Sequence, residues 1–262
     1  NLDAGPTNIV TGVQFSADSG LTVNLSGGNG QSVVFDNCRA LTASGSPGCA
    51  LTVLGTNSNV REESLFEWVN SSFSKLSTLT TDGFTGHFSF RNIHGFSVTG
   101  NTVFGTASEL SIEGSGLVAF GDIDTAGGMD FNINWSSVTI ASQGFVAQPT
   151  YVKSAVTIRS SYVLNLPIVS PTGTPLTNTI FIGGSIVDIS YATISMSGAL
   201  SVVIAGCYIN STASPTVPAN WFLTSNNITI ANSQLTSIAM TVTAFAGVAA
   251  QNFSSRNCAF IP

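Results

Sequence analysis

Apolar and polar positions alternate along this chain in a unit that recurs roughly every 20–26 residues. The clearest copies span 202–209, 228–235 and 253–260, and each reads apolar, any, apolar or small, any, Asn or Gly, Ser or Cys, any, apolar. With the Ser/Cys position as a mark, the frame extends back to the start of the chain. The marks are Asp18, Cys38, Ser71, Ile93, Ser115, Ser136, Ser161, Ser185, Cys207, Ser233 and Cys258.

Two apolar columns support this frame. The residue five places before each mark is always apolar: Val13, Val33, Phe66, Phe88, Leu110, Phe131, Val156, Ile180, Val202, Ile228 and Phe253. The residue three places before is apolar in every copy except the last, which has Ser255. Residues two apart on a strand point to the same face, so each copy predicts a strand with one buried side. One coil cannot bury that side alone, but a stack of coils forms a continuous core.

The residue before the mark predicts a sharp bend between two strands. It is Asn in five copies, namely Asn37, Asn70, Asn92, Asn232 and Asn257, and Gly in three others. Asn and Gly accept the left-handed backbone that such a bend requires. We therefore predict an all-β, single-domain parallel β-helix over residues 1–262, with about eleven coils and an Asn ladder at the turn. A β-sandwich or jelly roll would show turn signals every 8–12 residues or so, and the longer repeat disfavours both.

This pattern resembles the right-handed β-helix class of pectate lyases, polygalacturonases and phage tailspikes, in which Asn ladders at the second turn recur. The resemblance covers nearly the whole chain and concerns architecture, not one family. It implies a right-handed coil, in agreement with the general preference for right-handed crossovers between parallel strands.

One interval is longer than the rest. The 33 residues from Cys38 to Ser71 predict an inserted loop over 42–60, with Ser46-Pro47-Gly48 at its tip. Proline-bounded segments at 171–175 and 214–219 predict further excursions. Because loops carry specificity in such folds, 42–60 and 212–221 are candidate contacts to glycans or a host surface.

Charge is scarce and unevenly distributed. Only 8% of residues are charged, against roughly 25% in ordinary globular proteins. The 17 Phe residues argue for a real core, and disordered chains lack such residues. The half from residue 131 onward contains four ionisable groups of the Asp, Glu, Lys and Arg types: Lys153, Arg159, Asp188 and Arg256. This half is interpreted either as a surface that packs on copies of itself or a partner, or as a Ser/Thr/Asn-coated free surface.

The cysteines give one disulfide candidate. Cys38, Cys207 and Cys258 share one repeat position, which predicts a buried Ser/Cys ladder. Two coils separate Cys207 from Cys258, about 9.6 Å, which exceeds the roughly 7 Å between Cα atoms that a disulfide tolerates. Cys38 and Cys49 flank the inserted loop and could be bridged, or could stay free. No CxxC pair occurs, so we expect no zinc site and no metal.

Asp122 and Asp124 form the catalytic candidate. On a strand they would lie on one side, about 7 Å apart, and glycoside hydrolases use two carboxylates about 5–9.5 Å apart. Polygalacturonase-like enzymes, however, resemble one another through Asn-x-Asp, Asp-Asp, Gly-His-Gly and Arg-x-Lys motifs. Here His94-Gly95 is a fragment of the third motif, and Arg-x-Lys is absent. A solvated turn is therefore the preferred interpretation, with an active site or a calcium site as alternatives and no other cofactor expected.

Two further groups are assigned to structure. Glu62, Glu63 and Glu67, with their neighbours, are interpreted as a short helical surface insert. His87 and His94 are interpreted as core-edge residues held by hydrogen bonds.

The functional hypothesis follows from the rod, the low charge and the incomplete enzyme motifs. It is a structural and adhesive subunit of an extracellular, cell-surface or virion assembly, such as a tail spike, a fibre or a filament. Its expected partners are copies of itself and surface glycans. The net charge of −6 argues against nucleic acid, and the absence of a run of 18 apolar residues argues against membrane insertion. The alternatives are a polysaccharide lyase or glycoside hydrolase acting in a lateral groove, and a monomeric glycan-binding module.

Overall fold

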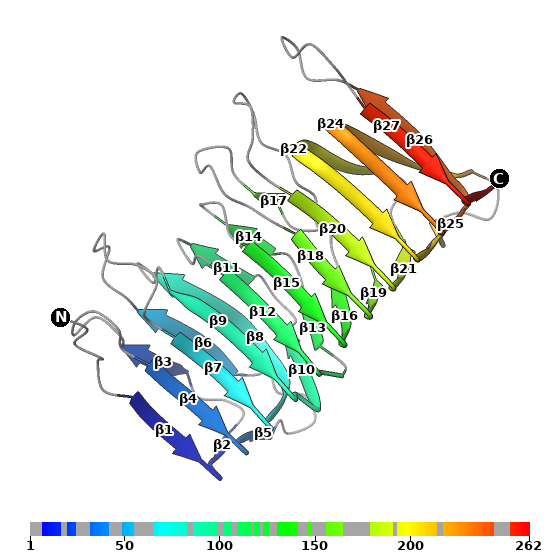
Figure 1. The fold of residues 1–262 in the computed structure, drawn as a ribbon. Helices are drawn as coiled ribbons and strands as arrows, with labels where there is room; N and C mark the ends of the chain where they lie inside the picture. Colours follow the sequence, from blue (N-terminus) through cyan, green and yellow to red (C-terminus); the bar gives the residue numbers. More distant parts are fainter. Residues whose placement is uncertain are drawn as a thin grey trace.

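The chain folds as a right-handed parallel β-solenoid, which confirms the predicted class. All regular elements in the described part of the chain are β-strands. The computed structural model describes residues 7–16, 20–24, 32–41, 49–54, 65–82, 86–98, 102–105, 109–116, 118–120, 123–125, 130–140, 146–147, 156–164, 179–190, 193–213, 217–243 and 252–262. Successive coils stack into a rod, with the two termini at opposite ends (Figure 1).

The strands form three columns along the rod (Figure 1). The first column contains β1 (Thr7–Thr11), β4 (Ser32–Asp36), β7 (Leu65–Val69), β9 (His87–Arg91), β12 (Glu109–Glu113), β15 (Asp130–Asn134), β18 (Val156–Arg159), β20 (Thr179–Gly183), the ends of β22 (Thr193–Ala205) and β24 (Ala219–Ala231), and β27 (Asn252–Arg256).

The second column contains β2 (Gln14–Ser16), β5 (Arg39–Leu41), the start of β8 (Ser72–Asp82), β10 (Gly95–Val98), β13 (Val118–Phe120), β16 (Ser137–Ile140), β19 (Tyr162–Leu164), β21 (Ile186–Ile189), β23 (Tyr208–Ser211), β25 (Gln234–Thr236) and β28 (Ala259–Ile261). The third has two stretches: β3 (Leu21–Asn24), β6 (Cys49–Leu54), the end of β8, β11 (Thr102–Gly105), β14 (Ile123–Thr125) and β17 (Val146–Ala147); then the starts of β22 and β24 with β26 (Ile238–Thr243).

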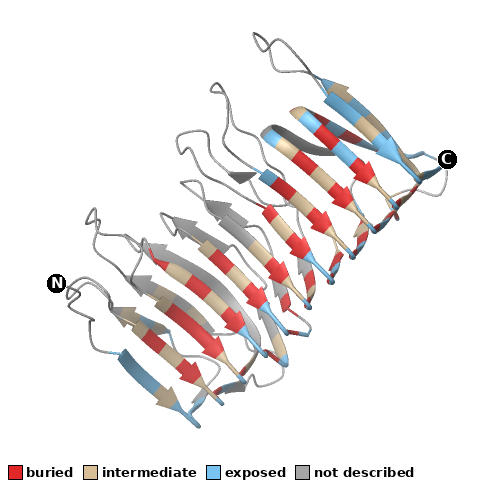
Figure 2. Cartoon of the chain, in the orientation of Figure 1, coloured by how far each residue is buried: buried red, intermediate tan, exposed pale blue. Residues whose placement is uncertain are grey.

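The register confirms the predicted frame from Cys38 to Cys258. Val33 pairs with Phe66, and the same column continues in step through every predicted apolar position to Phe253. In β4, β9, β12, β18 and β20 the described inward residues are buried and alternate with more exposed ones (Figure 2), whereas Phe253 in the last coil is exposed. Each mark in this range therefore corresponds to one coil.

The first coil was placed wrongly in the predicted frame. Val33 pairs with Asn8, not with Val13. The mark of this coil is Val13, since Gly12 takes the left-handed turn and its N–H donates to the Asp36 carbonyl at 3.1 Å. The error arose because Val13 and Phe15 are two apart and apolar, so they satisfied the frame by coincidence. Asp18 lies outside the described residues.

The bend between the first and second columns uses a left-handed residue in successive coils. The five Asn residues of the predicted ladder have φ between 50° and 53°. Their side chains also stack: Asn92 donates to Asn70 at 2.6 Å, Asn70 donates to Asp36 at 3.0 Å, and Asn257 donates to Asn232 at 3.2 Å. An amide side chain tolerates this backbone and links neighbouring coils as well, which explains why Asn recurs there.

A second ladder runs inside the rod at the marks. The Ser136 hydroxyl accepts the Ser115 backbone N–H at 3.1 Å and donates to the Asn134 carbonyl at 2.8 Å. The Ser161 hydroxyl repeats this arrangement one coil later. A buried backbone N–H without a hydrogen-bond partner would destabilise the folded state. Each ladder hydroxyl supplies that partner to the backbone N–H of the mark residue one coil earlier.

Part of the predicted loop over 42–60 is a strand. Cys49–Leu54 forms β6, which pairs in parallel with β3 and β8, so this part of 42–60 belongs to the wall of the rod. Its run of Leu51, Val53 and Leu54 suits a strand, and the nearby Ser-Pro-Gly signal obscured that. Likewise, Ala219–Ala231 is strand β24, and Trp221 is buried, so the end of the predicted loop 212–221 is core.

Candidate functional site

The predicted catalytic pair, Asp122 and Asp124, is not tested by the structure and stays a prediction. Asp122 lies outside the described residues. The backbone of Asp124 lies in β14, paired with Val103 of β11 and Val146 of β17, and its side chain is not described. Among the described residues, no group of three His, Cys, Asp or Glu side chains could hold a metal ion.

The predicted bridge between Cys38 and Cys49 is not formed in this structure. Cys38 is a free, buried thiol that donates to the Val10 carbonyl at 3.2 Å. It thus takes the place of a ladder serine, and Cys207 does the same toward Ile182. Burial raises the pKa of both thiols, which keeps them protonated and unreactive. The Cys49 side chain is not described.

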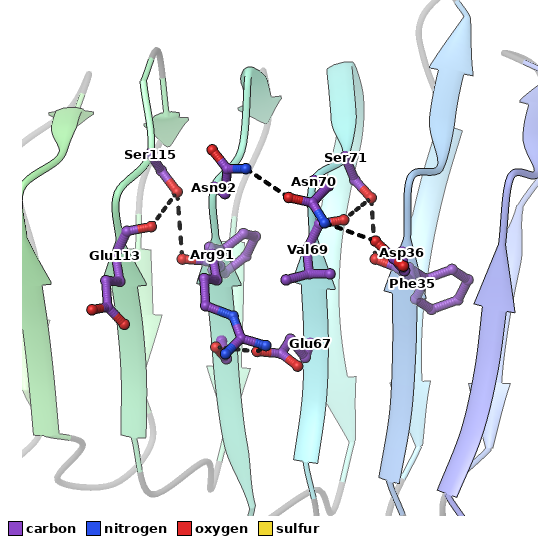
Figure 3. A network of polar contacts seen from close by, with 12 residues as sticks. Phe35, Asp36, Glu67, Val69, Asn70, Ser71, Arg91, Asn92, Glu113 and Ser115 are labelled. Atoms are coloured by element: carbon purple, nitrogen blue, oxygen red, sulfur yellow. Dashed lines mark hydrogen bonds and ion pairs between the residues drawn. The ribbon is translucent and has the colours of Figure 1, made fainter.

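The outer face of the first column carries a polar network in its N-terminal coils. Glu67 of β7 is only 8% exposed, although it points outward, because the Arg91 guanidinium of β9 covers it at 3.1 Å (Figure 3). The Ser89 hydroxyl donates to the same carboxylate oxygen at 3.1 Å. Glu67 is therefore part of a strand and nearly buried, which overturns the interpretation of this residue as belonging to a helical surface insert.

A second carboxylate lies two coils further along the same face. Glu109 of β12 is 2.8 Å from the His87 Nδ1 of β9, and the Asn132 amide donates to its other oxygen at 2.8 Å. The hydrogen bond from His87 lowers the pKa of the Glu109 carboxyl, with smaller support from Asn132. Glu109 is therefore ionised at neutral pH. Since a glycosidase's general acid needs a raised carboxyl pKa, Glu109 is unsuited to that role. His94, by contrast, is exposed at the turn.

The outer face of the second column differs in its C-terminal coils. Tyr162, Ile186 and Tyr208 are exposed and follow one another in register on β19, β21 and β23. Trp135 is 66% exposed and stands at the turn one coil earlier, two residues before Ser137, which is the register partner of Tyr162. We call these four residues the aromatic row.

A polar column lies beside the aromatic row. Asp188 of β21 accepts the Tyr162 hydroxyl at 2.9 Å and, more weakly, the Asn210 amide at 3.5 Å. The hydrogen bond to Asp188 raises the pKa of Tyr162, so its phenol remains a donor. The row combines apolar rings with oriented polar groups, which suits recognition of a ligand that has both apolar and hydroxyl-bearing faces.

Sequence reasoning missed the aromatic row, although the repeat frame contained a signal. Tyr162, Ile186 and Tyr208 each follow a mark directly, and that position points outward in the predicted coil. Large apolar residues at an outward position in three successive coils could have been noticed.

Comparisons of the chain with protein-family models, with curated proteins and with solved structures find no match. None of the described residues forms a helix long and apolar enough to cross a membrane.

Proposed function

We propose that the protein is a structural and adhesive β-helical subunit of an extracellular or virion assembly, such as a tail spike, fibre or surface filament, and that it self-associates through its C-terminal coils. The observation that carries this proposal is the distribution of exposed large apolar side chains. Among the described residues, Ile9 and Val13 lie in the first coil. Phe253, Phe260 and Ile261 lie in the last coil, and Trp135, Tyr162, Ile186 and Tyr208 form the aromatic row. The remaining three, Leu200, Val217 and Phe222, lie on or directly before β22 and β24.

The low charge of the same coils supports self-association. From residue 131 onward the chain has only four Asp, Glu, Lys or Arg residues, and one of them, Asp188, is hydrogen-bonded to its neighbours. Two such surfaces can meet without removing many charges from water, which is a main cost of burying a polar surface.

The side of the rod formed by β22, β24 and β26 is the surface we assign to this contact. Leu200 and Phe222 lie exposed on β22 and β24, and Val217 lies exposed just before β24. Phe222 sits between Ser195 of β22 and Thr241 of β26 in the register. Large apolar side chains flanked by short uncharged ones resemble the composition of a contact core.

Mass in solution, measured by light scattering over a range of concentrations, tests this proposal. We expect the wild-type chain to form a multiple of its 27.0 kDa mass. Phe222→Lys and Leu200→Lys should shift it toward the monomer, whereas His94→Lys, which adds the same side chain to an exposed N-terminal turn, should not. A wild-type chain that stays monomeric at every concentration would contradict the proposal.

A further inference from the structure

The aromatic row has a regular spacing along the rod. Tyr162 pairs with Ile186, and Ile186 pairs with Tyr208, so the two tyrosines are two coils apart. Two coil-to-coil spacings make this separation about 10 Å along the rod axis, which runs perpendicular to the strands. It is close to the length of a disaccharide in an extended glycan chain.

Trp135, at the start of the row, has a backbone conformation that is unfavourable for a bulky residue. Its φ is 46°, and bulky residues rarely adopt this left-handed region. The corresponding turn residue is Gly114 in the coil before and Ser160 in the coil after. A Cβ added at Gly114 or at Gly116 would meet no atom within 4 Å, so the space beside the turn is open. A strained, exposed indole contributes little to the core, which points to a role in binding.

The polar groups beside the row indicate which ligand chemistry it fits. Asp188 and Asn210 occupy adjacent positions of the next outward column, with Thr236 following in register. Carboxylate and amide groups exchange hydrogen bonds with sugar hydroxyls, while aromatic rings pack on the C–H faces of pyranoses. The strands β16, β19, β21, β23 and β25 contain no Lys or Arg. An anionic glycan would therefore meet the Asp188 carboxylate with no cation in these strands to offset it.

We propose that the aromatic row binds a neutral, extended polysaccharide that lies along the rod axis. Trp135, Tyr162 and Tyr208 contact the sugar rings, and Asp188 and Asn210 bind hydroxyl groups. The inference rests on the proposed adhesive function and names its ligand class. Tyr162, Ile186 and Tyr208 lie on the second column and Trp135 at the turn that precedes it, whereas the self-association surface lies on β22, β24 and β26, so the two properties can be tested separately.

The distribution of tryptophans provides a direct measurement. Trp68 and Trp221 are fully buried, whereas Trp135 is exposed, so acrylamide should quench chiefly the fluorescence of Trp135. The ligands are soluble hydroxyethyl cellulose, xylan, galactomannan and dextran, with anionic polygalacturonate for contrast. Affinity electrophoresis in gels that contain each polysaccharide measures binding independently.

We expect at least one neutral β-linked polysaccharide to retard the protein and to protect Trp135 from acrylamide, with polygalacturonate weaker. Tyr208→Ala should weaken retardation at least several-fold. Gln234→Ala, which changes the next residue of the same outward column, should leave it unchanged. Circular dichroism checks that both variants remain folded.

Three results would overturn the inference. One is no retardation by any neutral polysaccharide while Trp135 remains fully quenchable. Another is equal retardation of the wild type and Tyr208→Ala. The third is a wild-type oligomer in which Trp135 is already shielded without glycan, because the row would then be a contact between copies. An oligomer with an open Trp135 and no glycan binding leaves the proposed assembly standing and removes this site. A monomer that binds glycan would contradict the proposed self-association and support the glycan site.

Discussion

The described aromatic residues of the N-terminal coils are buried, whereas those of the C-terminal coils, apart from the buried Trp221 and the half-buried Phe181, are exposed. In the N-terminal coils the rings are inside: Phe66 packs edge-on against Trp68 at 4.5 Å between ring centroids, and Trp68 stacks on Phe90 of the next coil at 4.9 Å. In the C-terminal coils the inward positions of the first column are Val and Ile from β18 to β24. There, aromatic rings such as Tyr208 and Phe222 are exposed.

Charged side chains show a different contrast between the two halves. The outer face of the N-terminal coils carries the Glu67–Arg91 and His87–Glu109 pairs. In the C-terminal coils, Arg159 packs over the Phe181 ring at 4.9 Å, and Asp188 binds Tyr162. The comparison teaches that backbone pairing and the inward columns hold every coil in the same way. The outward columns are therefore free to differ, and we attribute function to that difference.

The inside-outside contrast predicts the largest effect. Trp68→Ala should lower the free energy of unfolding by about 3–5 kcal/mol, because it empties a buried volume in the aromatic stack. Tyr208→Ala, at an exposed position, should change it by less than about 0.5 kcal/mol. Urea unfolding followed by circular dichroism measures both. Equal losses would remove the distinction between the two halves.

The serine ladder predicts an intermediate effect. Ser136→Ala removes the hydroxyl that accepts the Ser115 N–H and should cost about 1–3 kcal/mol, because that buried donor loses its partner. Ser136→Cys should cost less, because Cys38 and Cys207 fill the same position in other coils. If Ser136→Cys were as damaging as Ser136→Ala, the equivalence of Ser and Cys in the ladder would fail.

The charged face predicts the smallest effect, and it depends on pH. The folded state holds the pKa of Glu109 below its unfolded value, so its contribution to stability is present above the ordinary carboxyl range. That contribution is lost as pH falls through the lowered pKa. Glu109→Gln should therefore reduce the acid sensitivity of the unfolding midpoint between pH 6 and 3 or so. An unchanged acid slope in this variant would show that the His87–Glu109 contact does not stabilise the rod.

Much of the fold could be predicted because the repeat encodes it locally. Apolar residues two apart and an Asn or Gly before the mark are requirements of each coil, so they are visible in the sequence. The first coil was misplaced because Val13 and Phe15 imitate the pattern. The burial of Glu67 could not be predicted, since it depends on Arg91 reaching across from the next coil. The aromatic row went unnoticed because an exposed tyrosine carries no mark of its function until its neighbours are known.

Hydroxyl-radical footprinting at low and high protein concentration tests the central claim, that the C-terminal side of the rod is the contact surface. We expect Leu200, Val217 and Phe222 to lose reactivity as the protein concentration rises. Tyr162 and Tyr208 should stay reactive until a neutral polysaccharide is added. Unchanged reactivity at Phe222, or protection that falls on the charged face around Arg91 instead, would contradict it.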